Sequence, residues 1–395
     1  MFLKLGWPDS TILFWKLAVF YASYFLVFGI YMPYWPLWLD AIGLTSIEIG
    51  WILAGSFWIK VLVQPAIAHF ADKRGETRIL TARLMGLSAL GFFFLSYAQS
   101  FWPVIILTII TAAFYQPVLP IMESVVLRCA KSNNLVYGRI RLWGSITFIV
   151  ATLGGGWWLE GTSNKYIVWL LIAGMALIAI SCALVPNRPK GPNPDLRFSK
   201  YKDYFLTPPF VLFLITTGLI HISHSVLYGF GTLYWRALGH SETIIGVFWS
   251  VGVLAEIVLF SIIGKYDVKF GPVMLLAIAA LATTIRWPLL AIFDSALALI
   301  LIQILHGFTF GAAHLGAMAF LTRSIPSEIS ATGQSLYYTL IGGVFSGCML
   351  PIAGKLYTDL SGNAFYIMGL IGILALLSSM YLGKLTKRDL SNPIE

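Results

Sequence analysis

Apolar stretches long enough to cross a membrane follow one another along almost the whole chain. A helix that spans the hydrocarbon core needs about 20 apolar residues. Charged residues are only 11% of the 395 residues, against roughly 25% in soluble proteins, and 58% are hydrophobic. We therefore predict an all-α membrane protein of twelve spanning helices, near residues 15–39, 45–68, 79–98, 103–128, 140–159, 166–186, 209–235, 243–264, 272–293, 297–322, 331–357 and 364–383.

One long polar stretch, rich in proline and lysine, divides these segments into six and six. It lies in residues 187–208 and predicts a cytoplasmic linker between two six-helix bundles, 1–186 and 209–395, the second ending in a short tail. Two halves of similar layout are typical of carriers built from repeats, whose binding site lies near the membrane midplane between the halves.

We attribute the net charge of +9 to the topology of the chain in the membrane and not to binding of a nucleic acid. Basic residues gather in alternate connections, and by the positive-inside rule this places both termini in the cytoplasm. The three cysteines lie far apart in or beside apolar segments, so we predict packing roles for them and neither a disulfide framework nor a metal site. The basic connections contain Lys73, Arg74 and Arg78; Arg128, Lys131 and Arg139; Arg188, Lys190, Arg197, Lys200 and Lys202; Lys265 and Lys269; and Lys384, Lys387 and Arg388.

Two charged residues lie within one apolar hairpin, Glu123 and Arg141. A charge in the bilayer core costs several kcal/mol unless it is paired or faces a water-filled cavity. Two helices that fold back on each other could bring this acid and this base face to face. We interpret them as lining a wet central cavity, with a purely structural ion pair as the alternative.

Lys60 is the other charge out of place, midway along the second predicted span and too deep to reach the interface easily. Together with Arg141 and Arg286, against Glu123 and Glu256, it leaves the predicted cavity with one excess positive charge. That excess suits an anionic substrate. The alternative is that Lys60 pairs with an acid or extends to the interface.

Several motifs agree in order along the chain. The segment ADKRG at 71–75 resembles the loop signature of the major facilitator superfamily, in which Asp72, Arg74 and Gly75 would form the gating loop. The segments FGIYMPYWPLWLDAIGLT, GRIRLWGS and LHGFTFGAAH resemble the branch that holds lactose permease and the phenylpropionate permeases. This resemblance implies a secondary transporter that works by alternating access.

In the first half, the resemblance places Glu123 and Arg141 on the acid and base that hold the sugar in lactose permease. An arginine fork and a carboxylate suit that task, because they donate to and accept from hydroxyl groups. Phe148 stands where the permease stacks its sugar on a tryptophan. Lys60 matches a cavity-facing position at which phenylpropionate permeases carry a base.

In the second half, Arg286 and His306 match the permease's coupling site. The proton-carrying carboxylate expected one turn after His306 is replaced by Thr309, and the expected lysine before it is Gln303. The two buried acids of the seventh helix are replaced by histidines. The further candidates for a polar or proton-carrying role are thus His221, His224 and His314.

Glu256 lies mid-span in the eighth predicted helix, one helical turn from the position of the permease's own acid. A buried carboxylate can take up and release a proton near neutral pH. Arg286 on the next helix is a plausible counter-charge. The alternative is a permanent Glu256–Arg286 pair that carries no proton.

Together these patterns predict proton-coupled uptake, across a bacterial inner membrane, of a small organic acid with an apolar or aromatic body. Symport of a neutral sugar or nucleoside, an uncoupled uniporter and an exporter remain alternatives. Zinc-protease and serine-hydrolase motifs are absent, which argues against an enzyme. We expect no cofactor, a proton and the lipid bilayer as partners, and a monomer.

Overall fold

The computed structural model describes residues 9–187, 202–265, 270–326 and 329–391. These residues form helices and connecting turns, and no strand occurs among them. By length and composition, 11 helical stretches in the described ranges can cross a membrane. The last stretch, Thr332–Thr386, has 55 residues and contains a break, at which α16 ends at Leu360 and α17 begins at Ala364. The chain is thus a multi-pass membrane protein.

Contacts between Cα atoms divide the chain into two compact units. The first contains Met1–Thr45, Trp58–Pro192 and Ser241–Gly246. The second contains Ser46–Phe57, Asn193–His240 and Val247–Glu395. The division follows the order of the chain except at the beginnings of two helices, α2 and α11, which are grouped with the opposite half of the sequence.

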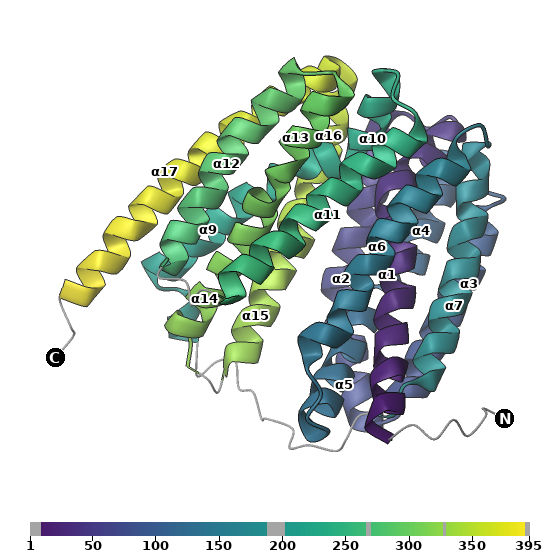
Figure 1. Cartoon of the computed structure of the whole chain (residues 1–395), viewed down its shortest axis with the longest axis horizontal. Coiled ribbons are helices and arrows are strands. Elements are labelled where there is room, and N and C mark those ends of the chain that lie inside the picture. The colour runs from purple at the N-terminus through teal and green to yellow at the C-terminus, as the bar shows by residue number, and fades with distance from the viewer. Residues whose placement is uncertain (1–8, 188–201, 266–269, 327–328, 392–395) are drawn as a thin grey trace. The chain divides into compact units, whose positions relative to one another are not determined.

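In the first unit, α1 packs along α6 and α7, and α3 packs along α4 and α7 (Figure 1). Aromatic residues fill its core, where the rings of Trp35 and Trp38 stack with centroids 4.7 Å apart. Apart from the beginning of α11, the elements that lie wholly or partly in this unit are α1 (Asp9–Ala41), α2 (Ser46–Arg74), α3 (Thr77–Leu95), α4 (Phe101–Tyr115), α5 (Val118–Ser132), α6 (Tyr137–Leu159), the 3-10 turn η1 (Asn164–Tyr166) and α7 (Ile167–Leu184).

The predicted fourth span at 103–128 is interrupted. Helix α4 ends at Tyr115 and α5 begins at Val118, with Gln116 and Pro117 between them. Proline has no backbone N–H and its ring clashes with the preceding turn, so a helix does not continue unchanged through it. The break lies one and a half turns before Glu123 and sets the direction of the short helix that carries this acid.

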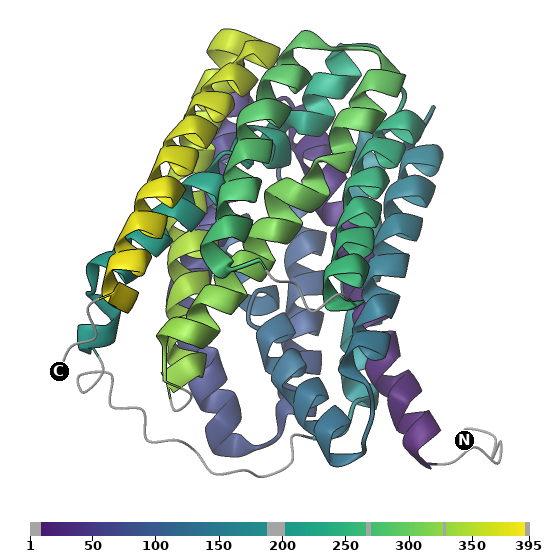
Figure 2. The same ribbon diagram turned by 60° about the vertical axis from the view of Figure 1, so that its left-hand side comes forward.

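In the second unit, α12 and α17 lie side by side, and α9 packs on α17 (Figures 1 and 2). Phe213 of α9 stacks on Phe320 of α14 with ring centroids 4.3 Å apart, which anchors the core of this unit. Its elements are α8 (Lys202–Phe205), α9 (Pro208–Ile222), α10 (Ser225–Ala237), α11 (Glu242–Lys265), α12 (Pro272–Ile292), α13 (Ala296–Ile304), η3 (Gly307–Ala312), α14 (Ala313–Ser324), α15 (Ser330–Thr339), η5 (Leu340–Phe345), α16 (Ser346–Leu360), η6 (Ser361–Asn363) and α17 (Ala364–Ser391).

Two of these elements, η3 and η5, are π-helical turns within longer helices. Such turns are rare and occur frequently at functional sites, because the extra residue turns neighbouring side chains to a new direction. The turn η3 begins directly after His306 and contains Thr309. Both side chains contact Arg286 of α12 (Pro272–Ile292).

Glycines explain why the beginning of α11 is grouped with the first unit. A Cβ at Gly156 of α6 would clash with the carbonyl oxygen of Glu242, and one at Gly246 of α11 would clash with that of Thr152. The two helix ends therefore touch backbone to backbone, which a larger residue would prevent. In the second unit, Gly50 of α2 and Gly354 of α16 make the same reciprocal contact with the carbonyls of Leu350 and Ser46.

Candidate functional site

The first polar cluster lies in the first unit and is centred on Glu123 of α5. The hydroxyl of Tyr137, the first residue of α6, donates a hydrogen bond to Oε1 of Glu123 at 2.5 Å. The hydroxyl of Tyr21 on α1 donates in turn to that of Tyr137 at 3.4 Å. The donors therefore form a chain from Tyr21 through Tyr137 to the carboxylate.

Arg141 of the same cluster rests on aromatic rings. Its guanidinium carbon is 3.9 Å from the ring centroid of Phe25 and 5.5 Å from that of Tyr21. A guanidinium over a ring face is attracted by the ring quadrupole. Among the described residues, no ion pair joins Glu123 to Arg141, so the predicted acid and base share one cluster without direct contact.

Phe148 and Lys60 lie elsewhere in the first unit. The ring of Phe148 packs 6.0 Å from that of Phe28 and is only 5% exposed, so it is part of the α1–α6 packing. Lys60 is half-buried midway along α2. Within the described part of the chain, its ammonium takes part in no hydrogen bond or ion pair.

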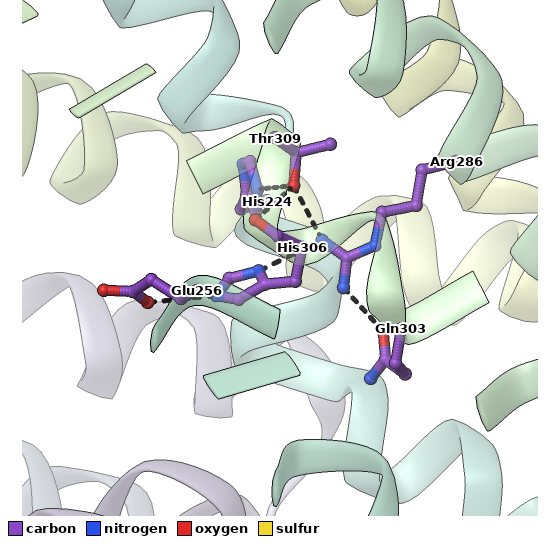
Figure 3. A network of polar contacts seen from close by, with 6 residues as sticks. All are labelled: His224, Glu256, Arg286, Gln303, His306 and Thr309. Atoms are coloured by element: carbon purple, nitrogen blue, oxygen red, sulfur yellow. Dashed lines mark hydrogen bonds and ion pairs between the residues drawn. The ribbon is translucent and has the colours of Figure 1, made fainter. Parts of the chain in front are cut away.

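The second polar cluster lies in the second unit and is built around Arg286 of α12, which is 1% exposed (Figure 3). One terminal nitrogen of the guanidinium donates to Oε1 of Gln303 at 2.5 Å. The other donates to Oγ1 of Thr309 at 2.9 Å and lies 3.2 Å from Nδ1 of His306. The Nε atom is buried without a hydrogen-bond partner. Arg286 and His306, the two residues that the resemblance places in the coupling site, are thus in contact.

The hydrogen bonds determine which ring nitrogen carries the proton. An arginine can only donate, so Nδ1 of His306 is an acceptor and its proton is on Nε2. Nδ1 of His224 is 2.9 Å from the carbonyl oxygen of Ile220, which can only accept, so this nitrogen carries the proton. In the neutral form of the His224 ring, Nε2 accepts from Thr309 at 3.1 Å. His224 thus links the carbonyl of Ile220 to Thr309.

Glu256 of α11 is the acid nearest to His306 in this cluster. Its Oε2 is 3.9 Å from Nε2 of His306, which is the protonated nitrogen and lies beyond hydrogen-bond distance (Figure 3). His306 therefore lies between the cation Arg286 and the acid Glu256. All three hydrogen-bond partners of Arg286 are neutral groups, so the charge of this buried guanidinium is balanced only at a distance.

The remaining candidates are peripheral to this network. His314 stacks on Phe310, with centroids 6.4 Å apart, and Phe310 stacks on His306 at 5.4 Å. His221 is half-buried on α9, one residue before the end of that helix. In the predicted gating loop, Gly75 has φ +71° and its N–H bonds to the carbonyl of Ala71, a helix cap that favours glycine. The side chains of Asp72 and Arg74 lie outside the described residues.

Sequence reasoning missed Tyr137, Tyr21 and Phe25. Tyr137 precedes Arg141 by four residues, and residues four apart lie on one face of a helix. That spacing was the available signal for Tyr137. No comparable signal linked α1 to the cluster, because its contacts join residues more than a hundred positions apart.

Comparison with known proteins identifies the class. The MFS_1 like family of the major facilitator superfamily matches residues 14–368, so the chain belongs to this family of membrane transporters and is not an enzyme. The chain is 29% identical to the probable 3-phenylpropionic acid transporter of Escherichia coli (strain K12), over 91% of this chain and 95% of the relative. It is 26% identical to the maltose permease of Geobacillus stearothermophilus, over 91% and 92% of the two chains.

The solved structures agree in fold. The crystal structure of the nucleoside transporter NupG superposes with a TM-score of 0.83, covering 94% of this chain and 99% of that one, at 15% identity. At that identity, the likeness shows the fold alone. The predicted resemblance to the phenylpropionate and lactose permease branch is confirmed, since a lactose permease is among the more distant relatives.

Proposed function

We propose that this transporter takes up a small organic carboxylate with an apolar or aromatic body, driven by a proton, through alternating access. The observation that carries the proposal is the place of His306 between Arg286 and Glu256. With a histidine between an acid and a base, the arrival of a proton changes the contacts at a buried cation.

The hydrogen bonds suggest how a proton acts there. Nε2 of neutral His306 already carries a proton, so a second one must go to Nδ1, which is occupied by the bond from Arg286. Protonation of His306 therefore breaks that bond and places two cations side by side. Protonation of Glu256 instead removes the negative charge that faces His306. By either route, the uptake of a proton changes the electrostatic forces on the guanidinium of Arg286.

The nature of the substrate is inferred from charge. Lys60 and Arg286 are cations inside predicted spans, and the described contacts give neither a carboxylate partner within hydrogen-bond distance. An anionic substrate would offset part of the cost of burying such charges. The identity to a probable 3-phenylpropionic acid transporter supports an acid over a neutral sugar or nucleoside.

We place the chain in a bacterial inner membrane with twelve spans, in bundles 1–186 and 209–395 joined by the cytoplasmic linker 187–208. The 55-residue stretch Thr332–Thr386 supports the twelfth span, because about 80 Å of helix exceeds two crossings of about 30 Å. The basic connections support cytoplasmic termini. The bacterial origin of the relatives supports a location in a bacterial inner membrane. A monomer suffices for the mechanism.

Uptake into proteoliposomes tests the function. The purified protein is given a panel of aromatic acids, sugars and nucleosides, with and without an imposed proton gradient. We expect an aromatic acid to accumulate only with the gradient. Equal uptake in both conditions would make the protein a uniporter, and accumulation of a sugar or nucleoside alone would overturn the proposed substrate class.

A further inference from the structure

The two charges of the first cluster are each held by aromatic residues. Glu123 accepts from Tyr137 at 2.5 Å, and Arg141 lies 3.9 Å above the ring of Phe25. Tyr21 contacts both the Glu123–Tyr137 pair and Arg141, because its hydroxyl donates to Tyr137 and its ring centroid lies 5.5 Å from the guanidinium carbon of Arg141. Tyr21 is fully buried, so the position of its hydroxyl is set by the packing of α1.

Such an arrangement prevents an otherwise favourable contact. A carboxylate and a guanidinium inside a low-dielectric interior attract strongly and prefer a bidentate pair. A pair of that kind would use the donors of Arg141 and the acceptors of Glu123 on each other. A ligand would then have to break it before it could bind, which lowers affinity.

We propose that Tyr137 is a positioning residue that keeps Glu123 and Arg141 apart, so that the substrate must supply a hydrogen-bond donor to Glu123 together with an acceptor to Arg141. This inference rests on the proposed uptake of a carboxylate and narrows its class. A simple carboxylate beside Arg141 would face Glu123 with like charge and no donor. An acid that also carries a hydroxyl can accept from Arg141 with its carboxylate and donate to Glu123 with its hydroxyl. The substrate class is therefore a hydroxylated organic acid.

The positioning role is tested first without any ligand. Arg141 is labelled with phenylglyoxal in the purified full-length protein, and the labelled peptide is quantified by mass spectrometry. In Tyr137→Phe the ring remains but Glu123 is released, so we expect direct pairing to reduce labelling of Arg141 several-fold. The control is Tyr115→Phe, which also removes one tyrosine–tyrosine hydrogen bond, to Tyr31 at 3.1 Å. Unchanged labelling in Tyr137→Phe overturns the positioning role.

The substrate class is tested with matched acids. Binding of 3-phenylpropionate is compared with that of its three ring-hydroxylated isomers, by ligand-induced thermal stabilisation. We expect the wild type to bind one hydroxylated isomer at least about 10-fold more tightly, the worth of one hydrogen bond to a charged group. Tyr137→Phe should bring that ratio close to 1, and Tyr115→Phe should keep it.

The outcomes separate this inference from the proposed function. Equal binding of all four acids by the wild type, or an unchanged ratio in Tyr137→Phe, overturns the inference and leaves carboxylate uptake standing. If no acid binds the wild type but labelling of Arg141 still responds to Tyr137→Phe, the proposed substrate is wrong and the positioning role stands.

Discussion

Nδ1 of His306 lies 3.2 Å from a terminal nitrogen of Arg286, and because the arginine can only donate, the histidine accepts there. This one contact assigns the ring proton to Nε2, on the side of Glu256. It also means that His306 has two roles, as an acceptor for a buried cation and as a neighbour of an acid. The two roles can be separated by substitution.

His306→Asn should keep the first role and lose the second, since its side-chain oxygen is placed like Nδ1. We expect it to bind substrate with near-normal affinity and to stay folded, but to accumulate substrate poorly against a gradient. His306→Leu leaves the buried guanidinium with one acceptor fewer and should lower the free energy of unfolding by about 1–3 kcal/mol. Thermal unfolding and uptake of both variants provide the measurement; equal stability of the two would contradict the acceptor role.

Glu256→Gln should act as a permanently proton-loaded carrier. We expect it to exchange substrate across the membrane at a rate close to that of the wild type and to lose accumulation driven by a proton gradient. Counterflow and uptake in proteoliposomes distinguish the two activities. Asp359→Asn, which removes an exposed acid paired with Lys355 at 3.0 Å, is the control. Full accumulation by Glu256→Gln would move the proton to His306 or to another group.

Arg141→Lys should weaken substrate binding by about 10- to 100-fold although the charge is kept. An ammonium provides neither the bidentate fork nor the flat face that rests on Phe25. Ligand-induced thermal stabilisation measures the affinity. Arg139→Lys, an exposed arginine on the same helix, should bind normally. Near-normal affinity in Arg141→Lys would show that this arginine does not hold the substrate.

Lys60→Met, a substitution of similar size, should weaken binding of the acid by about 10- to 150-fold, the loss expected for one charged hydrogen bond of about 1.5–3 kcal/mol. The neutral amide or ester of the same compound, already a poor ligand, should be affected much less. Comparing the two affinities in wild type and variant measures the effect of the substrate's charge. An equal loss for acid and neutral analogue would make Lys60 structural and favour a neutral substrate.

Gly156→Leu should destabilise the protein by about 1–3 kcal/mol, because its side chain would meet the backbone of Glu242 at the α6–α11 crossing. Gly154→Leu is a matched control on the same helix, since a Cβ there meets nothing within 4 Å. The thermal unfolding midpoints of the two variants are compared. A similar midpoint for both would show that the crossing can open without cost.

The helical membrane fold followed from sequence alone. Without water in the bilayer core, each apolar stretch must satisfy its backbone groups internally, and a helix does this within one segment. Composition therefore predicted the helices, and the rarity of intramembrane charges singled out Glu123, Arg141, Lys60 and Glu256, whereas Arg286 came from the resemblance to a known family. Local chemistry also left a signal at Pro117, where the predicted fourth span is broken into α4 and α5.

Only the tertiary structure decided which of these charged residues lie close together and which side chains lie between them. Helical periodicity tells which residues share a face, but the partner of that face depends on the rotation and tilt of other helices, and these arise from packing far along the chain. Glu123 was expected opposite Arg141, and the structure places the hydroxyl of Tyr137 on its carboxylate. Arg286 was considered as the direct counter-charge of Glu256, and His306 lies between them, directly before a π-helical turn that no sequence pattern predicted.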